Sequence, residues 1–374
     1  MRLLIYVALM SLATHALANN IIEGNQGSKI KGSVVERFQN AWAMSFISSD
    51  RLLVTTKSGD LWLVNTNGEK SLVASVPKVF YGGQGGLGDV VPHPNFKQNK
   101  FIYISYISSD TAGDTRYATV VRAELNIKNS PKLENITTVW NQTPARSGKG
   151  HFSHKITLGQ QGSKHEGKIF ITSGDRQEQT PAQHWDKALG KIIRLNDDGS
   201  VPADNPFQDK GELAKTFWSI GHRNSLGIAF NQKNELWAHE MGPKHGDELN
   251  LILPGANYGW PIVSEGNHYS GAVIPTHDTR PEFQKPKLFW VPTVAPSGLF
   301  FYQGDEFQDW NGDAFLGGLK GRALVRIEFK NDLPVEAERF SWSQRVRDVE
   351  LGSDGAIWAL EDGRSGRLIK FIKA

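Results

Sequence analysis

The sequence predicts an all-β protein, a six-bladed β-propeller with four-stranded antiparallel blades. Three observations predict it. Short apolar segments bounded by turn residues recur along the chain, six of them are separated by about one blade and its loops, and no intervening segment is suited to a crossover helix. The 38 glycines and 17 prolines are enough to supply the many turns of such a fold.

The six segments follow turns such as His93–Phe96 and Ser353–Gly355, and further strand-like runs such as Leu61–Val64 and Leu368–Phe371 come after several of them. The intervals between the segments, roughly 40 to 80 residues, match one four-stranded blade plus loops of varying length. The predicted strands are Arg51–Thr56, Phe101–Tyr106, Lys168–Thr172, Glu235–His239, Asp313–Gly317 and Ala356–Leu360.

The rest of the chain favours a single domain over residues 19–374. No low-complexity tract or block of like charge marks a linker. A β-sandwich is the main alternative, but it would have to accommodate about 350 residues in one or two units. Radial repetition of blades accommodates that length directly.

The composition excludes several classes of function. Lys+Arg 42 against Asp+Glu 39 gives a formal charge of +3, so we expect no nucleic-acid partner. The absence of cysteine excludes disulfides, thiolate metal sites and a cysteine nucleophile. Any redox chemistry must therefore come from a bound cofactor.

The N-terminus has the pattern of a secretory signal peptide over residues 1–18. Met1-Arg2 is followed by the apolar run Leu3–Leu12, and Ala16–Ala18 provides small residues at a cleavage site before Asn19. The apolar run is too short to span a bilayer, so we expect an exported protein without a membrane span. A buried N-terminal helix is the alternative.

A candidate general base comes from His151 and Asp175, which flank one predicted pair of strands. A carboxylate on one ring nitrogen fixes the histidine tautomer and stabilises the imidazolium that forms when the other nitrogen takes a proton. The alternative is a purely structural hydrogen bond between the two residues. His154 is a second candidate for the base.

Cationic residues form a second group of candidates. Arg223 and Asn224 lie in a glycine-flanked loop, and a planar guanidinium suits a carboxylate or a quinone oxygen. Arg345 and Arg347, two positions apart on a strand, should face the same side. With Lys320 they could form a pocket for a planar polyanion, although a solvated face or structural ion pairs would also explain them.

Two further kinds of segment point to ligands. The glycine-rich segment Tyr81–Asp89 would let the backbone approach a flat ligand, or would simply make a tight turn. Carboxylates and loop carbonyls gather in His239–Pro243, Gly246–Asn250 and Gly255–Pro261, and such hard oxygen ligands suit Ca²⁺. The EF-hand spacing is absent, so spacing alone leaves the ion open.

On these residues the chain resembles the soluble, pyrroloquinoline-quinone-dependent glucose/sorbosone dehydrogenases, and more closely their periplasmic aldose sugar dehydrogenase branch. The resemblance covers nearly the whole mature chain, and the fold of that family is a six-bladed propeller. The motifs that carry it are Gly83–Leu87 with His93-Pro94, Leu189–Leu195 with Asp198-Gly199 and Pro202–Pro206, Gly221–Asn224, Gly246–Asn250 and Asn257–Pro261.

The resemblance implies that His151 is the general base and that Asp175 supports it. It also implies carbonyl donation from Gly242 and Pro243 to a Ca²⁺ at the cofactor, and a second, structural Ca²⁺. The ligands of that second ion would include Glu248 and Tyr258. The implied contacts to the quinone cofactor are Gln84, His151, Arg223, Asn224, Lys320, Arg345 and Arg347.

The implied reaction oxidises an aldose at C1. His151 would take the proton of the anomeric hydroxyl, hydride would pass from C1 to the quinone, Ca²⁺ and Arg223 would stabilise the charge that develops on the cofactor, and the sugar would leave as its lactone. The resemblance leaves the preferred sugar and the electron acceptor open. Insertions typical of the dimeric glucose dehydrogenases are missing, so we expect a monomer.

One departure from the family pattern is Phe152–Lys155, where relatives usually have glycines and an arginine; it would place bulk and an extra cation beside the base and so bear on sugar choice. Two other readings of the chain stay open. A non-catalytic, calcium-stabilised binding propeller would keep the blades but lose the base or the cations. A calcium-dependent propeller lactonase would need several Asp, Asn or Glu ligands at the channel centre.

Overall fold

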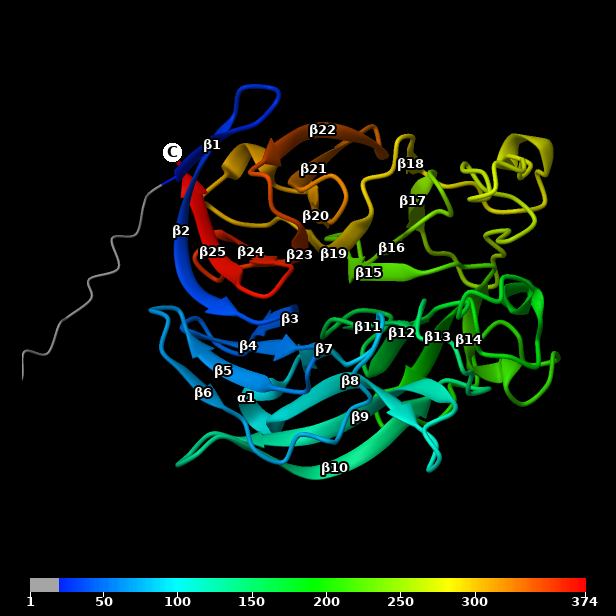
Figure 1. Cartoon of the computed structure of the whole chain (residues 1–374), viewed down its shortest axis with the longest axis horizontal. Helices are drawn as coiled ribbons and strands as arrows, with labels where there is room; N and C mark the ends of the chain where they lie inside the picture. The colour runs from blue at the N-terminus through cyan, green and yellow to red at the C-terminus, as the bar shows by residue number, and fades with distance from the viewer. Residues whose placement is uncertain (1–19) are drawn as a thin grey trace, which may run out of the picture.

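The computed structural model describes residues 20–374, which fold into six antiparallel sheets arranged as blades around a central axis (Figure 1). Five of these sheets have four strands and one has five, so the predicted six-bladed propeller is confirmed. The predicted signal peptide, residues 1–18, lies outside the described residues. In the described part of the chain, no helix is long and apolar enough to cross a membrane.

In each of the first three blades the strands follow chain order from the inside outwards, and the first strand lies at the axis. Their strands are, for blade 1, β3 (Ala41–Phe46), β4 (Arg51–Thr56), β5 (Leu61–Asn65) and β6 (Lys70–Leu72); for blade 2, β7 (Leu87–Pro92), β8 (Phe101–Ser109), β9 (Arg116–Asn126) and β10 (Lys132–Asn141); and for blade 3, β11 (Ser153–Leu158), β12 (Lys168–Ser173), β13 (Lys191–Asn196) and β14 (Phe217–Ile220).

The other three blades complete the ring. Their strands are, for blade 4, β15 (Ser225–Phe230), β16 (Leu236–Glu240), β17 (Asp247–Leu251) and β18 (Leu288–Trp290); for blade 5, β19 (Pro296–Phe301), β20 (Ala314–Gly318), β21 (Ala323–Lys330) and β22 (Leu333–Ser341); and for blade 6, β23 (Val346–Leu351), β24 (Ile357–Glu361), β25 (Gly366–Lys373), β2 (Lys29–Phe38) and β1 (Asn20–Glu23). Helical turns are short: α1 (Phe96–Asn99), η1 (Thr180–Gln183), η2 (Ala214–Thr216), η3 (His277–Thr279) and η4 (Gln308–Trp310).

Each of the six predicted segments is the second strand of a blade: β4, β8, β12, β16, β20 and β24. These strands are flanked on both sides within their sheet and pack against neighbouring blades, so they are the most uniformly apolar. The inner strands are harder to predict because they carry charged side chains into the central channel. Asp89, Lys155 and Asp348, for example, lie on β7, β11 and β23.

The two ends of the chain close the ring. β2 pairs with β25 over a long antiparallel register, from Ile30 opposite Lys373 to Phe38 opposite Gly366. Figure 1 shows this pairing as a blue strand beside a red one. β1 adds a fifth strand outside β2, which is the one departure from the predicted four-stranded blades. After closure, the unpaired edges of the inner strands are short and face the central channel.

Apolar clusters fill the space between neighbouring blades. Tyr103 of blade 2 and Phe217 of blade 3 belong to one such cluster, and both are completely buried. Val54 of blade 1 and Leu368 of blade 6 belong to the cluster at the closing junction. Burial of one such side chain contributes about 1.5–3 kcal/mol, so packing between blades can stabilise the ring without disulfides.

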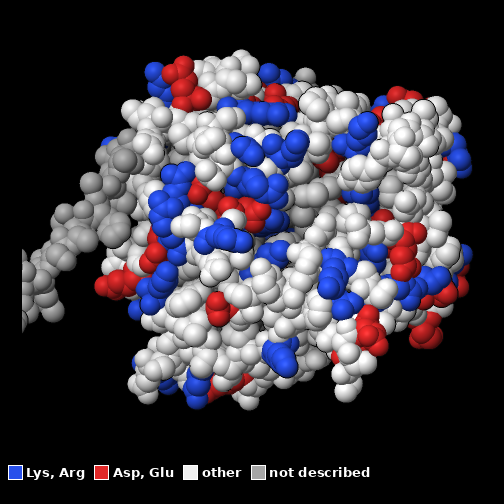
Figure 2. Space-filling view, in the orientation of Figure 1, with Lys and Arg blue, Asp and Glu red and all other residues white. Residues whose placement is uncertain are grey.

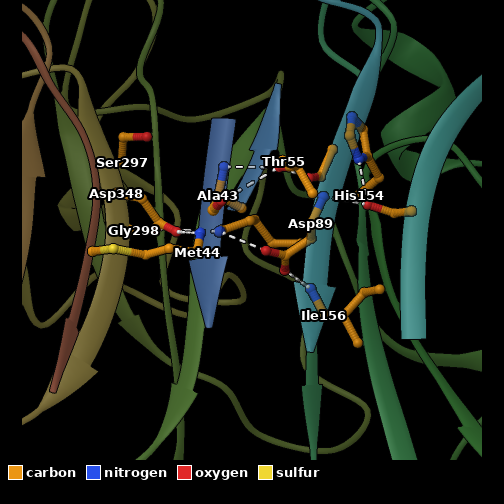
Figure 3. Close-up of polar contacts among 12 residues, drawn as sticks. Ala43, Met44, Thr55, Asp89, His154, Ile156, Ser297, Gly298 and Asp348 are labelled. Atoms are coloured by element: carbon orange, nitrogen blue, oxygen red, sulfur yellow. Dashed lines mark hydrogen bonds and ion pairs between the residues drawn. The ribbon is translucent and has the colours of Figure 1, made fainter. Parts of the chain in front are cut away.

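The inner strands are joined across the channel by a buried ion pair network (Figure 3). Lys155 Nζ on β11 lies 2.8 Å from Asp89 Oδ1 on β7 and 3.4 Å from Asp348 Oδ1 on β23. Asp89 Oδ2 accepts a hydrogen bond from the Ile156 amide at 2.7 Å, and Asp348 Oδ2 accepts one from the Met44 amide at 2.9 Å. Four of the six blades are thereby connected at the axis.

This network corrects one expectation. The Lys155 cation does not lie beside the candidate base, because its stem runs along the channel and its ammonium group is held between two carboxylates. Beyond the network, where the inner strands end, lies a cavity of about 390 Å³. All six inner strands line it, among others through Thr157, Phe301 and Glu350.

We expect Lys155→Met to destabilise the fold by about 3–5 kcal/mol, because it removes the only cation between two buried carboxylates among the described residues. Urea unfolding at pH 7 measures this change. Lys233→Met is the matched control, since Lys233 and Asp332 form an exposed pair that should contribute less than about 1 kcal/mol. Equal stability of the two variants would contradict a role for the network in holding the blades together.

Candidate active site

His151 and Asp175 form the centre of the candidate site. His151 Nδ1 lies 2.7 Å from Asp175 Oδ1, and their side chains are 9% and 0% exposed. His151 precedes β11 with φ of +46°, a left-handed conformation that is uncommon outside glycine. This conformation raises the energy of the backbone by roughly 1–3 kcal/mol, and it orients the ring toward the carboxylate.

The surroundings of Asp175 define the state of the histidine. Asp175 Oδ1 also accepts a hydrogen bond from the Gln177 amide at 2.9 Å, and Oδ2 accepts one from Trp260 Nε1 at 2.8 Å. These contacts use both oxygens of Asp175 as hydrogen-bond acceptors. His151 Nδ1–H therefore donates a hydrogen bond to Asp175, which leaves the lone pair of Nε2 available to accept a proton.

Two of the predicted cofactor contacts lie directly beside this pair. Gln84 Oε1 accepts a hydrogen bond from the His151 amide at 2.7 Å, and Asn224 Oδ1 accepts one from Ser153 Oγ at 3.1 Å. Gln84 therefore holds the backbone of the base, and Asn224 holds the side chain of Ser153 close by. Gln84 lies in the glycine-rich segment and is exposed, so its NH₂ group faces the open side of the site.

Arg223 joins blade 4 to this group. Its Nη1 donates to the carbonyl oxygens of Met241 at 2.9 Å and Gly242 at 2.7 Å, and its guanidinium carbon lies 5.2 Å from the centre of the Trp260 ring. Its own carbonyl accepts a hydrogen bond from the Asp175 amide at 2.9 Å. The guanidinium is thus fixed by two carbonyls and one aromatic face.

The arginines of the C-terminal blade face the same side, as predicted, because one carboxylate holds both. Asp362 Oδ2 lies 2.7 Å from Arg345 Nε and 3.1 Å from Arg347 Nη2. Burial acts to raise the pKa of Asp362, but the two arginines outweigh burial and hold the pKa below its ordinary value. Two cations share one anion here, so a net positive charge is left for an anionic ligand. Lys320, which follows β20, is exposed.

Figure 2 shows Lys and Arg side chains gathered around the middle of the face in view, with a few acidic side chains among them. One basic residue that the sequence did not single out is Lys57, which follows β4. Its Nζ donates to the Gly83 carbonyl at 2.9 Å. Burial, followed by the charge of Arg347, lowers the pKa of Lys57, so this ammonium lies close to the arginine pair.

Three of the predicted calcium ligands, Gly242, Glu248 and Tyr258, line one small cavity. The Gly242 carbonyl already accepts a hydrogen bond from Arg223, and the Gly242 amide donates to Asp247 Oδ1 at 3.0 Å. The cavity has a volume of about 10 Å³, close to the space of one water molecule or ion, and Arg223 and Trp260 also line it.

The chemistry of this small cavity suits a cation. Burial, and next the charge of Glu240, raise the pKa of Glu248 well above its ordinary value. The Oδ1 atom of Asn250 beside it is buried without a hydrogen-bond partner. The Tyr258 hydroxyl donates to the Leu251 carbonyl at 2.6 Å, so only its main-chain carbonyl could serve as a ligand. No three His, Cys, Asp or Glu side chains between residues 20 and 374 are grouped to hold a metal, so carbonyl oxygens would have to complete the set.

His154, the second candidate for the base, does not take part. Its ring stacks on Trp42 with centroids 5.5 Å apart, and its Nδ1 lies 2.7 Å from Ser105 Oγ (Figure 3). Burial lowers the pKa of His154 to about 3. No carboxylate supports this ring, so it is a neutral part of the core rather than a base.

Sequence reasoning missed three residues that the structure brings into the site: Trp260, Asp362 and Lys57. Trp260 lies within a motif that carried the resemblance, but a tryptophan gives no chemical signal of its own in a sequence. Asp362 follows a predicted strand and is separated from the arginines by a hairpin. Antiparallel pairing of β23 with β24 places the side chains of Asp362 and the two arginines at one end of the blade.

The sequence profile of the Glucose / Sorbosone dehydrogenase family matches residues 38–370. The chain belongs to this family. It is 34% identical to the Aldose sugar dehydrogenase YliI of Escherichia coli, over 90% of each chain, and 25% identical to the Quinoprotein glucose dehydrogenase B of Acinetobacter calcoaceticus, over 98% of this chain and 94% of that one.

Solved structures agree with this placement. The apo-form of the soluble aldose sugar dehydrogenase from Escherichia coli superimposes with a TM-score of 0.87, at 32% identity, over 92% of this chain and all of that one. The PQQ-bound aldose sugar dehydrogenase from Streptomyces coelicolor shares the fold, with a TM-score of 0.74 at 24% identity over 92% of this chain and 98% of that one. The family is one of oxidoreductases.

We expect His154 to make the fold sensitive to mild acid. The folded state holds this ring neutral down to about pH 3, whereas the unfolded state protonates it near pH 6.5, so stability is lost as the pH falls below about 6.5. The loss is about 1.4 kcal/mol per pH unit. Urea unfolding at pH 7 and pH 5 should show a smaller pH effect in His154→Gln than in the wild type. The exposed His184, changed to Gln, is the control, and an unchanged pH effect in His154→Gln would contradict the expectation.

Proposed function

We propose that this protein is a pyrroloquinoline-quinone- and Ca²⁺-dependent aldose sugar dehydrogenase that oxidises the C1 hydroxyl of aldoses to lactones. The observation that carries the proposal is the pairing of His151 with the fully buried Asp175, linked through Trp260 to Arg223. A supported base and a fixed cation at one site are what proton removal beside a polyanionic acceptor requires. Family membership supports the same assignment.

The residues suited to hold the quinone are the predicted ones. Arg345 and Arg347 have one carboxylate between them and can donate hydrogen bonds to further anionic oxygens, as can the exposed Lys320. The remaining contacts would come from Gln84, Arg223 and Asn224, which surround His151. Carbonyl oxygens of Gly242 and Pro243 would hold the Ca²⁺ beside it, with Arg223 sharing the first of them.

The chemistry of the protein's own groups follows from the geometry. His151 Nε2 accepts the proton of the anomeric hydroxyl, and Asp175 stabilises the imidazolium that results. Arg223 lies where it can stabilise negative charge on a neighbouring oxygen. When bound, pyrroloquinoline quinone supplies the two-electron acceptor to which the C1 hydrogen passes as hydride.

A second Ca²⁺ would be structural. The small cavity beside Glu248 and the Tyr258 carbonyl combines a buried carboxylate with an unpartnered amide oxygen at Asn250. A divalent cation there would compensate charge that burial makes costly. A monomer exported to the periplasm by residues 1–18 completes the proposal, which the signal-like pattern of those residues supports.

The channel centre gives less support to a lactonase. Such an enzyme would need several oxygen ligands free to bind Ca²⁺ at the axis. The aspartates there, Asp89 and Asp348, already hold the ammonium group of Lys155 between them.

Reconstitution tests the proposal directly. Purified protein is assayed for dye-linked oxidation of a panel of aldoses with and without added pyrroloquinoline quinone and Ca²⁺, while bound quinone is followed by its absorbance. We expect activity only when both are present. Absence of quinone binding would overturn the proposal in favour of a binding propeller, and quinone binding without turnover would overturn the aldose as substrate.

We expect His151→Ala to lower kcat by about 10²–10⁴-fold, because a positioned general base contributes that much, while quinone affinity stays within about threefold of the wild type. Steady-state kinetics and quinone titration measure the two effects. His184→Ala, at an exposed position, is the control. Wild-type kcat in a folded His151→Ala variant would refute the assignment of the base.

We expect Arg345→Ala to weaken quinone binding by about 10- to 100-fold, the cost of losing a hydrogen bond between charged groups. Absorbance titration of the apoprotein with the quinone measures the dissociation constant. Arg51→Ala is a suitable control, because Arg51 begins β4 and pairs loosely with the exposed Asp50 at 3.8 Å. Equal affinity in the two variants would argue against the cation pocket.

A further inference from the structure

We infer that Trp260 is a positioning residue that holds the base-supporting carboxylate and the site guanidinium in one fixed arrangement. The inference rests on the proposed function for its kinetic consequence. Its structural part concerns the apoprotein alone. No chemical group of Trp260 exchanges a proton or electron, so its contribution would be geometric.

The indole N–H supports one oxygen of Asp175 that nothing else supports. Oδ1 of this carboxylate accepts hydrogen bonds from His151 Nδ1 and from the Gln177 amide. Oδ2 accepts from Trp260 Nε1, at 2.8 Å, and from no other donor among residues 20–374. Because Asp175 is completely buried, water cannot replace this donor. The indole therefore fixes the rotation of the carboxylate and keeps Oδ1 aimed at the histidine.

The face of the same ring lies against Arg223. The guanidinium carbon is 5.2 Å from the ring centre, within the range of a cation–π contact. With its Nη1 donating to both the Met241 and Gly242 carbonyls, the guanidinium has little freedom to rotate. One side chain thus touches both the group behind the base and the cation beside it.

The backbone of Trp260 is held as firmly as its ring. Its amide donates to the Gly221 carbonyl at 3.0 Å, and its carbonyl accepts from Gln183 Nε2 at 2.7 Å. Gly221 has φ of +77°, and a Cβ there would come within 2.2 Å of Asn257 Oδ1, so only glycine permits this close approach. With 6% of its surface exposed, Trp260 has no room to swing away.

Two substitutions separate the two contacts. Trp260→Phe keeps an aromatic face against Arg223 and removes the N–H, whereas Trp260→Leu removes both. Trp290→Phe is the matched control, since Trp290 is equally buried and its Nε1 donates to Glu336 Oε2 at 2.7 Å, away from the site. Urea unfolding of all three variants identifies any loss that is only a loss of folded protein.

The first readout uses apoprotein labelled with ¹⁵N-histidine. The Hδ1 proton of His151, identified by its absence in His151→Ala, should give a low-field NMR resonance because of its short hydrogen bond to Asp175. We expect Trp260→Phe to shift or broaden this resonance and Trp290→Phe to leave it unchanged. An unchanged resonance in Trp260→Phe would overturn the inference.

The second readout is kinetic. We expect Trp260→Phe to lower kcat by about 10- to 100-fold, the loss of one hydrogen bond to a charged group, with KM and quinone affinity within about threefold. Trp260→Leu should also weaken quinone binding by at least about tenfold, because Arg223 loses its support. Wild-type kcat in Trp260→Phe would overturn the positioning role. If the wild type itself has no quinone-dependent activity, the proposed function fails, and the NMR resonance alone decides whether Trp260 positions the pair.

Discussion

Ring closure is the constraint on which the rest of this structure depends. No single blade can bury both of its faces, so each needs a neighbour on either side, and the last needs the first. The pairing of β2 with β25 satisfies that need by bringing the two ends of the chain into one sheet. Once the ring is closed, six inner strands converge on one axis, and on the proposed function residues as distant in sequence as Gln84 and Arg347 contact the same cofactor.

Convergence also creates a cost, because the inner strands carry charges into a narrow space. At the axis the cost is offset by pairing, with Lys155 between Asp89 and Asp348. At the end where the inner strands begin, positive charge is left partly uncompensated, as the two arginines around Asp362 show. The first arrangement holds blades together, and the second is free to attract an anion.

The sequence predicted the blades because second strands are buried on both faces and bounded by turns, so their pattern is local. It also predicted the His151–Asp175 pair, since the two residues flank one hairpin. It could not predict contacts that depend on how blades pack. Trp260 reaches Asp175 from the next blade, and Lys155 turned out to point into the channel rather than toward the base, because only the closed ring defines where the channel runs.

The ion pair across the channel bears on how substrates enter the candidate site and how products leave it. Its three side chains are buried, and neither His151 nor Asp175 lines the cavity beyond them. We therefore expect the candidate site to open on one side of the ring only. On the proposed function, the sugar and the electron acceptor must enter through this one opening in turn, so the lactone leaves before the acceptor binds. Such alternation is a ping-pong kinetic order, in which each substrate binds after the product of the other has left.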